Sequence, residues 1–79
     1  MAKKIIVYST PSCVWCHKLK SWLKENKIQF EDIDVSLDRI RAMEMVQKSG
    51  QMGVPVTDID GNIIIGFDLS KLKELLKIK

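Results

Sequence analysis

Strand-like and helix-like hydrophobic patterns alternate along the 79 residues of this chain, and this alternation restricts the possible folds more than any other feature. Residues 3–8, 28–35 and 54–59 are runs rich in apolar and β-branched side chains, which is typical of strands. Apolar residues recur with helical spacing in the two stretches between these runs. Asp60-Gly61-Asn62 predicts a tight hairpin turn into a fourth strand at 62–66, and a last helix follows Asp68.

The predicted order is therefore β-α-β-α-β-β-α, an α/β arrangement. A strand-helix-strand unit forms a right-handed crossover between parallel strands, whereas the closing hairpin is antiparallel. We expect a four-stranded mixed sheet flanked by three helices in a single domain over residues 1–79, because a chain of this length buries one core only. The alternation in the second run changes phase at Glu31-Asp32, which predicts a bulge or an early break there.

Each predicted helix has residues typical of a helix end and an apolar stripe. Ser12, Ser36 and Asp68 are expected N-caps, Gly50 is an expected C-terminal signal, and Asn26 is expected in a left-handed conformation. Lys20 and Met45 fall outside the stripes. The residues expected to face the core are Trp15, Leu19, Trp22 and Leu23, with Cys16 at the edge, then Leu37, Ile40, Met43 and Val46, and finally Leu69, Leu72, Leu75 and Leu76.

Composition and charge exclude several classes of protein. The net charge of +3 is too small to predict nucleic-acid binding, and no apolar run approaches the ~20 residues of a membrane helix. The first residues lack the apolar stretch of a signal peptide, so we expect a cytoplasmic protein. Lysines concentrate in residues 1–27 and 71–79, which indicates either solvated helix faces or a field that favours acidic partners and a nearby thiolate. No apolar stripe is left over for a dimer, so we expect a monomer.

The two cysteines, Cys13 and Cys16, open the first predicted helix. Two thiols are too few for a secreted disulfide framework, and with His17 they leave a structural zinc site one ligand short. Unsatisfied N–H groups at a helix N-terminus favour the thiolate, which is the reactive form of a thiol. Cys13 should therefore be the exposed attacking thiol, and Cys16, about one turn further, the recessed resolving thiol. No metal site is expected.

The segment from Tyr8 to Lys18, with Gly53-Val54-Pro55-Val56 and Gly66-Phe67-Asp68 in that order and spacing, resembles a glutaredoxin. More narrowly, it is similar to the small prokaryotic glutaredoxin-like redoxins. The resemblance covers essentially the whole chain and implies a thioredoxin-like fold with sheet order 2-1-3-4. It also implies a cis bond at Val54-Pro55 and a loop that faces the reactive cysteine, where Val54 offers backbone groups to an extended substrate.

The resemblance further implies thiol–disulfide exchange on disulfide-containing or glutathionylated proteins, with no bound cofactor and with glutathione as co-substrate. Gly66-Phe67-Asp68 aligns with the segment that binds the γ-glutamyl end of glutathione. Thr10 stands where glutathione-using members carry a basic residue, and Leu69 stands in place of a second Asp. These departures resemble redoxins that are reduced by thioredoxin reductase and supply electrons to ribonucleotide reductase. Arg39 or Arg41 is either a partner for a glutathione carboxylate or a solvated helix residue.

Several residues near the motif have more than one interpretation. Trp15 either flanks the incoming disulfide or packs in the core. His17 is expected on the solvent side, and Met52 is expected near the Pro55 loop.

Two other functions compete with the redoxin interpretation. The string Cys13-Val14-Trp15-Cys16-His17 also matches a covalent haem-attachment motif, with Met52 as a second axial ligand, but its place between a strand and a helix disfavours that. Some glutaredoxins bridge a [2Fe–2S] cluster, which the nearby Cys16 disfavours. The favoured prediction is a dithiol thiol–disulfide oxidoreductase that carries electrons in cell redox homeostasis.

Overall fold

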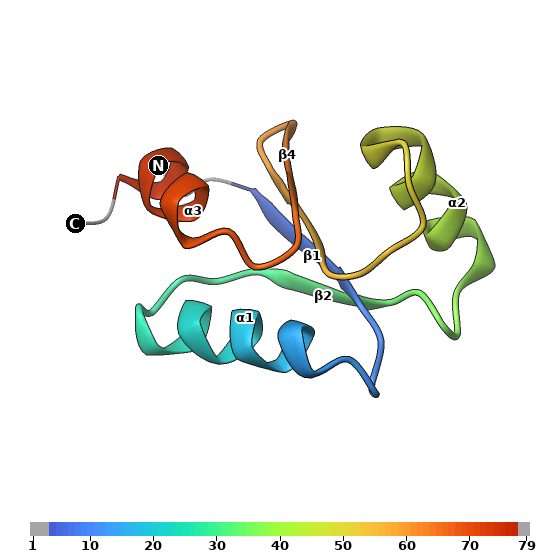
Figure 1. The fold of residues 1–79 in the computed structure, drawn as a ribbon, viewed down its shortest axis with the longest axis horizontal. Helices are drawn as coiled ribbons and strands as arrows, with labels where there is room; N and C mark the ends of the chain where they lie inside the picture. The colour runs from blue at the N-terminus through green and yellow to red at the C-terminus, as the bar shows by residue number, and fades with distance from the viewer. Residues whose placement is uncertain (1–3, 78–79) are drawn as a thin grey trace.

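A computed structural model describes residues 4–77 of the chain. Three helices flank one four-stranded sheet of strand order β2-β1-β3-β4, so the predicted element order and the sheet order 2-1-3-4 are both confirmed (Figure 1). Within the described residues, no helix has the length and apolar character needed to cross a membrane. The elements are β1 (Ile5–Ser9), α1 (Val14–Glu25), β2 (Glu31–Asp34), α2 (Arg39–Ser49), β3 (Val56–Ile59), β4 (Asn62–Ile65) and α3 (Leu69–Leu76).

Strand β1 lies at the centre and organises the sheet. It pairs in parallel with β2 and antiparallel with β3, so that Val7 lies between Asp32 and Thr57. The β3–β4 hairpin turns through Asp60 at φ 51° and Gly61 at φ 92°, and positive φ at both turn positions matches the right-handed twist of the strands. Strand β2 covers Glu31–Asp34 and pairs with β1 in regular register through Glu31 and Asp32, so the bulge or break predicted there is wrong, and the strand instead starts three residues later than residue 28.

Side chains alternate along β1 and thereby divide the core into two parts. Ile5 and Val7 face α1 and α3, whereas Ile6 and Tyr8 face α2 on the other side of the sheet (Figure 1). All four side chains are buried. The first part also contains Leu19, Leu23, Ile59, Ile64 and Leu72, and the second contains Ile33, Met45 and Val56.

Two of the predicted N-caps are wrong. The cap of α1 is Cys13 and not Ser12, because the Cys13 sulfur accepts the Cys16 N–H. The cap of α2 is Asp38, whose Oδ1 accepts the Arg41 N–H at 3.0 Å. Ser36 instead donates from its backbone N–H and its hydroxyl to Asp34 Oδ1, which fixes a local turn before α2.

The other helix ends are mostly as predicted. Asp68 caps α3 by accepting the Lys71 N–H at 3.2 Å, and Gly50 ends α2 at φ 75°. Asn26 stays at φ −90°, and it is Lys27 that takes the left-handed conformation, at φ 58°. The side-chain amide of Asn26 donates to the Trp22 carbonyl, so this residue satisfies the helix end without a left-handed backbone.

The predicted inner face of α2 is wrong except at Val46, which packs against the core as expected. Met45 is buried at 2% exposure, whereas Met43 is 59% exposed and Ile40 is 77% exposed. Leu37 lies before the helix and is exposed as well. In the other helices, Trp15 is 57% exposed, Leu69 is 38% exposed and Trp22 is partly buried against the core.

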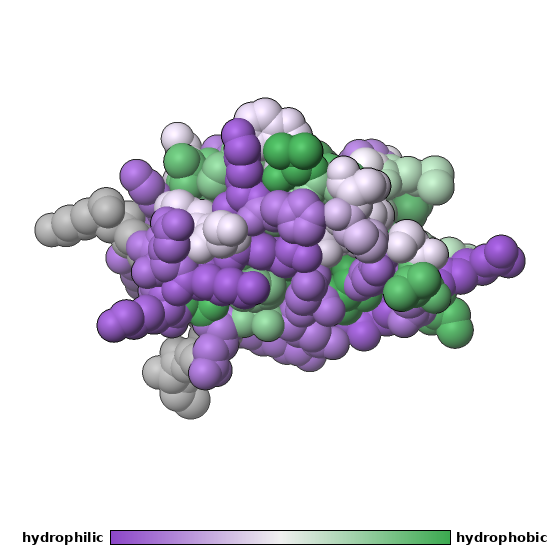
Figure 2. Space-filling view, turned by 90° about the horizontal axis from the view of Figure 1, so that it is seen from below, coloured by the Kyte–Doolittle hydropathy of each residue, from purple (hydrophilic) through white to green (hydrophobic). Residues whose placement is uncertain are grey.

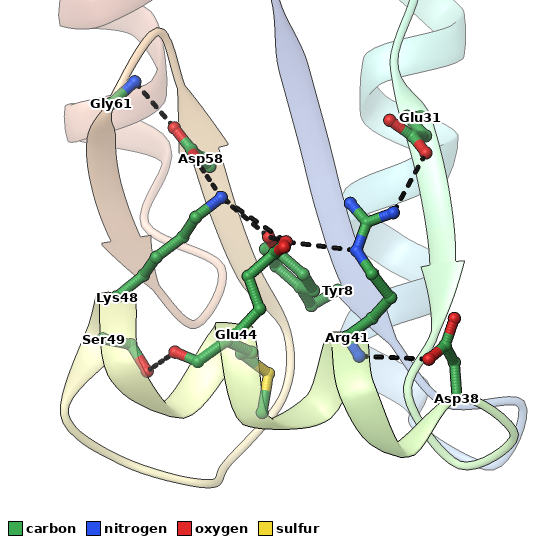
Figure 3. A network of polar contacts seen from close by, with 10 residues as sticks. Tyr8, Glu31, Asp38, Arg41, Glu44, Lys48, Ser49, Asp58 and Gly61 are labelled. Carbon is green, nitrogen blue, oxygen red and sulfur yellow. Dashed lines mark hydrogen bonds and ion pairs between the residues drawn. The ribbon is translucent and has the colours of Figure 1, made fainter.

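Polar side chains explain the orientation of α2, because they occupy the helix face that lies on the sheet (Figure 3). Tyr8 donates a short hydrogen bond from its hydroxyl to Glu44, and Lys48 Nζ donates to the Tyr8 hydroxyl at 2.8 Å. Lys48 also pairs with the buried carboxylate of Asp58 at 2.7 Å, and Arg41 Nε pairs with Glu44 at 3.1 Å. A hydrophobic stripe could not predict this face, since its central residues carry charges.

Hydrogen bonds within this cluster shift the pKa values of its members. The pKa of Glu44 lies below its ordinary value, chiefly because the Tyr8 hydroxyl donates to the carboxylate. The pKa of Tyr8 is raised by burial and by that same bond. Burial lowers the pKa of Lys48, but the hydrogen bonds to Asp58 and Tyr8 outweigh burial and leave it above its ordinary value. The cluster thus favours a charged Glu44 and a charged Lys48.

Candidate redox site

Cys13 occupies the junction between β1 and α1. Its N–H donates to the Thr10 carbonyl at 3.3 Å across the turn, and its own carbonyl accepts the His17 N–H at 3.2 Å as the first helical bond. The Cys13 backbone is extended, at φ −89° and ψ 112°, as an N-cap residue requires. Pro11 and Ser12 in the turn are exposed. The sulfur of Cys13 therefore sits where the unsatisfied N–H groups of a helix stabilise negative charge.

The two thiols differ in their access to solvent. Cys13 is partly exposed, whereas Cys16 is fully buried at 0% exposure, and both are free. The Cys16 N–H donates to the Cys13 sulfur at 3.1 Å. Burial, and then the hydrogen bond with Cys13, raises the pKa of Cys16 to about 12, against smaller lowering contributions from the Thr10 backbone and Lys20. Cys16 is thus a protonated thiol at neutral pH, and Cys13 is the thiol that a substrate can reach.

The loop before β3 faces Cys13. The Val54-Pro55 peptide bond is cis, as the family resemblance implied, and the Cys13 thiol points to the Val54 carbonyl oxygen at 3.9 Å. Pro55 is buried, and its carbonyl accepts the Gly66 N–H at 2.9 Å. Gly66 has φ 78°, a conformation in which a larger side chain would be strained. These contacts bring the loop and the end of β4 to the same side of the cysteine.

A groove of about 280 Å³ lies beside this loop. Trp15 and Phe67 form part of its wall, with ring centroids 6.4 Å apart and planes inclined at 43°. The ammonium group of Lys18 lies over the Trp15 ring, 4.6 Å from its centroid. Trp15 therefore packs at the surface beside the site and not in the core. The groove is lined by Trp15, Val54, Pro55, Gly66 and Phe67.

Past Phe67 a second, more open depression runs between α1 and α3, with a volume of about 570 Å³. Val14, Trp22 and Leu69 contribute apolar surface to it, and Val14 is 65% exposed. Figure 2, a view from below onto the side of α1, shows mostly hydrophilic residues with separate hydrophobic patches between them. The two depressions share Phe67, so apolar surface extends from the Val54-Pro55 loop along the helices.

The structure brings most of the predicted site residues together, but not all of them. Asp68 lies next to the groove residue Phe67, with one carboxylate oxygen used to cap α3. Met52 is 79% exposed and does not line the groove. Arg41 is paired with Glu44 and Glu31 on the α2 side of the sheet. His17 is exposed, as expected, with Nε2 at 2.7 Å from the Pro11 carbonyl.

Sequence patterns missed Lys20, which the hydrophobic stripe places outside the inner arc of α1. Its side chain is only 15% exposed, and Nζ donates to Asp32 Oδ2 at 3.0 Å and to the buried Ser9 hydroxyl at 3.3 Å. The one feature of the sequence that points to Lys20 as a residue near the site is its position four residues after Cys16, on the same side of the helix. Among the residues that the structure describes, no group of three or more His, Cys, Asp or Glu side chains could hold a metal ion.

Several known proteins with a similar sequence are glutaredoxins or glutaredoxin-like. A sequence model described as glutaredoxin matches residues 5–64. A glutaredoxin-like 8.6 kDa protein in the rubredoxin operon of Clostridium pasteurianum is 47% identical over 73 residues, which cover 92% of this chain and 97% of that protein. The glutaredoxin-like protein NrdH of Lactococcus lactis is 32% identical over 71 residues, which cover 90% of this chain and 97% of its own length.

Solved structures of thioredoxin-like and glutaredoxin-like proteins have a similar fold. A mutant of a thioredoxin-like protein has a TM-score of 0.91 at 34% identity, covering 96% of this chain and 97% of that chain. The NrdH-redoxin of Escherichia coli is described as having a thioredoxin-like activity profile. It has a TM-score of 0.79 at 26% identity, and the match covers 91% of this chain and 93% of that chain. The thioredoxin-like fold is therefore confirmed, and the chain belongs to the glutaredoxin family of thiol–disulfide oxidoreductases.

Proposed function

We propose that this protein reduces disulfides in proteins, or mixed disulfides of proteins with glutathione, through Cys13 and Cys16. The observation that carries the proposal is the difference between the two thiols. Cys13 is accessible at the start of α1, and its sulfur accepts the Cys16 N–H, whereas Cys16 is buried. An attacking sulfur must be accessible and stabilised as an anion, and a resolving sulfur must be protected from substrates other than the bound one.

The reaction takes two exchanges. The Cys13 thiolate attacks one sulfur of the substrate disulfide, a Cys13–substrate disulfide forms, and the other substrate sulfur leaves as a thiolate that takes up a proton. Cys16 then attacks the Cys13 sulfur, so the Cys13–Cys16 disulfide forms and the second substrate thiol is released. The substrate gains two electrons and two protons, and the protein is left oxidised. A donor then restores both thiols.

The Val54-Pro55 loop supplies the binding surface for the first exchange. Its backbone lies against the Cys13 thiol, so an extended substrate segment can pair with Val54 as an added strand does. Trp15 and Phe67 then contact the apolar side chains that flank the substrate sulfur. This arrangement accounts for a thiol–disulfide oxidoreductase that accepts polypeptide disulfides.

Two electron donors fit the site, and each is supported by its own observation. Glutathione is supported by Gly66, Phe67 and Asp68 beside the groove, where Asp68 can pair with the ammonium group of the tripeptide. A thioredoxin-reductase-type donor is supported by the similarity to NrdH proteins and by the apolar surface that continues past Phe67 between α1 and α3. The groove beside the Val54-Pro55 loop carries no charged side chain in its lining, so it suits an apolar segment of a protein better than a tripeptide with two carboxylates.

Serine variants test the roles of the cysteines. Cys13→Ser should abolish turnover, because it removes the accessible nucleophile. Cys16→Ser should accumulate a stable mixed disulfide with the substrate, which intact-mass measurement detects, while still turning over glutathionylated substrates. The assignment of the two roles would be reversed if Cys16→Ser lost its reaction with disulfides and Cys13→Ser retained it.

A paired turnover assay separates the donors. One mixed-disulfide substrate is reduced with NADPH and either glutathione with glutathione reductase or thioredoxin reductase alone. Asp68→Asn is the matched variant, because asparagine caps a helix as well as aspartate does but has no charge. If glutathione is the donor, Asp68→Asn should raise the KM for glutathione. Turnover only with thioredoxin reductase, unchanged in this variant, would assign the protein to the NrdH-like group.

A further inference from the structure

Lys20 is a cation held below the surface by two partners. Its side chain is 15% exposed, and its ammonium group donates to the carboxylate of Asp32 at 3.0 Å and to the hydroxyl of Ser9 at 3.3 Å. Ser9 is buried and also donates to Asp32, at 2.8 Å. A lysine usually extends its ammonium group into water, whereas here the bonds to Ser9 and to the half-exposed Asp32 carboxylate hold the charge in one place.

This fixed charge lies on the side of α1 that carries the Cys16 thiol. Lys20 follows Cys16 by four residues, about one helical turn, and helical side chains lean toward the N-terminus over the preceding turn. The groups that act on the Cys16 thiol are the thiol of the N-cap Cys13, the backbone of Thr10 in the turn after β1, and Lys20 of α1. Asp32 of β2 pairs with Lys20. Lys20 is the cation among them.

The second exchange needs such a cation. Cys16 must become a thiolate in a buried place, where a charge is costly. In the mixed disulfide the Cys13 sulfur is bonded to the substrate, so it is no longer an anion that could accept the Cys16 proton. We propose that Lys20, held by Ser9 and Asp32, is a positioning residue that stabilises the Cys16 thiolate while it resolves the mixed disulfide. This inference rests on the proposed role of Cys16 as the resolving thiol.

The balance of the step is simple. Cys16 loses its proton to water, its sulfur attacks Cys13, and the Cys13–Cys16 bond forms as the Cys13–substrate bond breaks. The released substrate thiolate takes up a proton, so no net proton is gained or lost. Lys20 stays protonated throughout and lowers the energy of the thiolate that precedes the attack.

The test follows the two exchanges separately with 5,5′-dithiobis(2-nitrobenzoate). Attack by Cys13 releases one coloured thiolate, and resolution by Cys16 releases the second, so stopped-flow absorbance records two phases. Lys20→Gln removes the charge but keeps an amide donor for Asp32 and Ser9, and Lys20→Arg keeps the charge. Lys24→Gln is the control, because it removes the same charge from an exposed position one turn further along α1.

A neighbouring cation shifts a thiol pKa by about one unit or more, which lowers the thiolate fraction about tenfold at neutral pH. A more basic sulfur is also a better nucleophile, with a Brønsted slope of ~0.4–0.5, so the net slowing is roughly threefold. We therefore expect the second phase of Lys20→Gln to be roughly threefold slower at neutral pH and its pH profile to move upward by about one unit. Lys20→Arg should restore both values, and the first phase should change little.

Three results would overturn the proposal: an unchanged second phase in Lys20→Gln, an equal slowing in Lys24→Gln, or a slow phase that Lys20→Arg does not restore. A merely structural tie between α1 and β2 would leave the pH profile in place, since Lys20→Gln keeps the hydrogen bonds. If the wild-type protein itself released only one thiolate, the proposed role of Cys16 would fail and the role of Lys20 would fail with it, whereas two phases in the wild type with no effect of Lys20→Gln would refute the role of Lys20 alone. Circular dichroism of each variant confirms that the fold is retained.

Discussion

Replacing Met45 with alanine should destabilise the protein by about 3 kcal/mol. Met45 is 2% exposed and lies in the core between α2 and the sheet, against Ile6, Tyr8 and Val56. Removing three heavy atoms loses roughly 0.8 kcal/mol of transfer free energy for each, and the cavity adds a further cost, which matches the 2–5 kcal/mol range for such changes. A 79-residue domain has a total stability of roughly 4–12 kcal/mol, so the loss is a large fraction.

The matched control is Met43→Ala, two residues away on the same helix. Met43 is 59% exposed, so its truncation should change the free energy of unfolding by less than about 0.5 kcal/mol. Urea unfolding followed by circular dichroism measures both variants, and thermal unfolding should show Met45→Ala lower by roughly 12–24 °C. If Met43→Ala were the more costly change, α2 would be rotated by about half a turn from the orientation described, and the account of its polar inner face would be wrong.

Three further changes test other contacts. Lys48→Met should cost about 2 kcal/mol in urea unfolding because it leaves the buried Asp58 carboxylate without its cation, and adding Asp58→Asn should recover part of that loss. Glu44 has a lowered pKa, so its stabilising contribution is present above its ordinary pKa of 4.5 and is lost as the pH falls through the folded value. Glu44→Gln should therefore flatten the acid side of a stability–pH curve, and an equally steep acid limb would contradict this. Trp15→Ala should lower kcat/KM for a protein disulfide roughly fivefold, because it removes the part of the groove wall that Trp15 forms with Phe67. The free energy of unfolding should be nearly unchanged, because the Trp15 side chain is 57% exposed.

The order of the elements could be predicted because apolar periodicity and turn residues are local properties. The helix ends depend on competition between neighbours, which a pattern does not contain. Ser36 has the right side chain for an N-cap, but Asp34 binds it first, and Asp38 takes the cap. The inner face of α2 was missed for a similar reason, because Glu44 and Lys48 become compatible with burial only through Tyr8 and Asp58, which are distant in sequence.

The candidate site likewise contains residues that the sequence predicts and one that it does not. Cys13 and Cys16 were evident from their spacing and from their place between a strand and a helix, and Val54-Pro55 and Gly66 followed from the family resemblance. Lys20 was not evident, since a lysine outside an apolar stripe is usually solvated. Its burial results from Ser9 and Asp32 on two adjacent strands, and only the folded sheet brings these together beside α1.

Strand β2 has a consequence for how the folded protein meets other strands. It forms one outer edge of the sheet, and three of its four residues are acidic: Glu31, Asp32 and Asp34. A second copy pairing along this edge would bring like charges side by side, which disfavours ordered aggregation. The opposite edge, β4, is mainly isoleucine, and Ile65 is 53% exposed. Growth of this sheet by edge-to-edge pairing is therefore opposed on one side only.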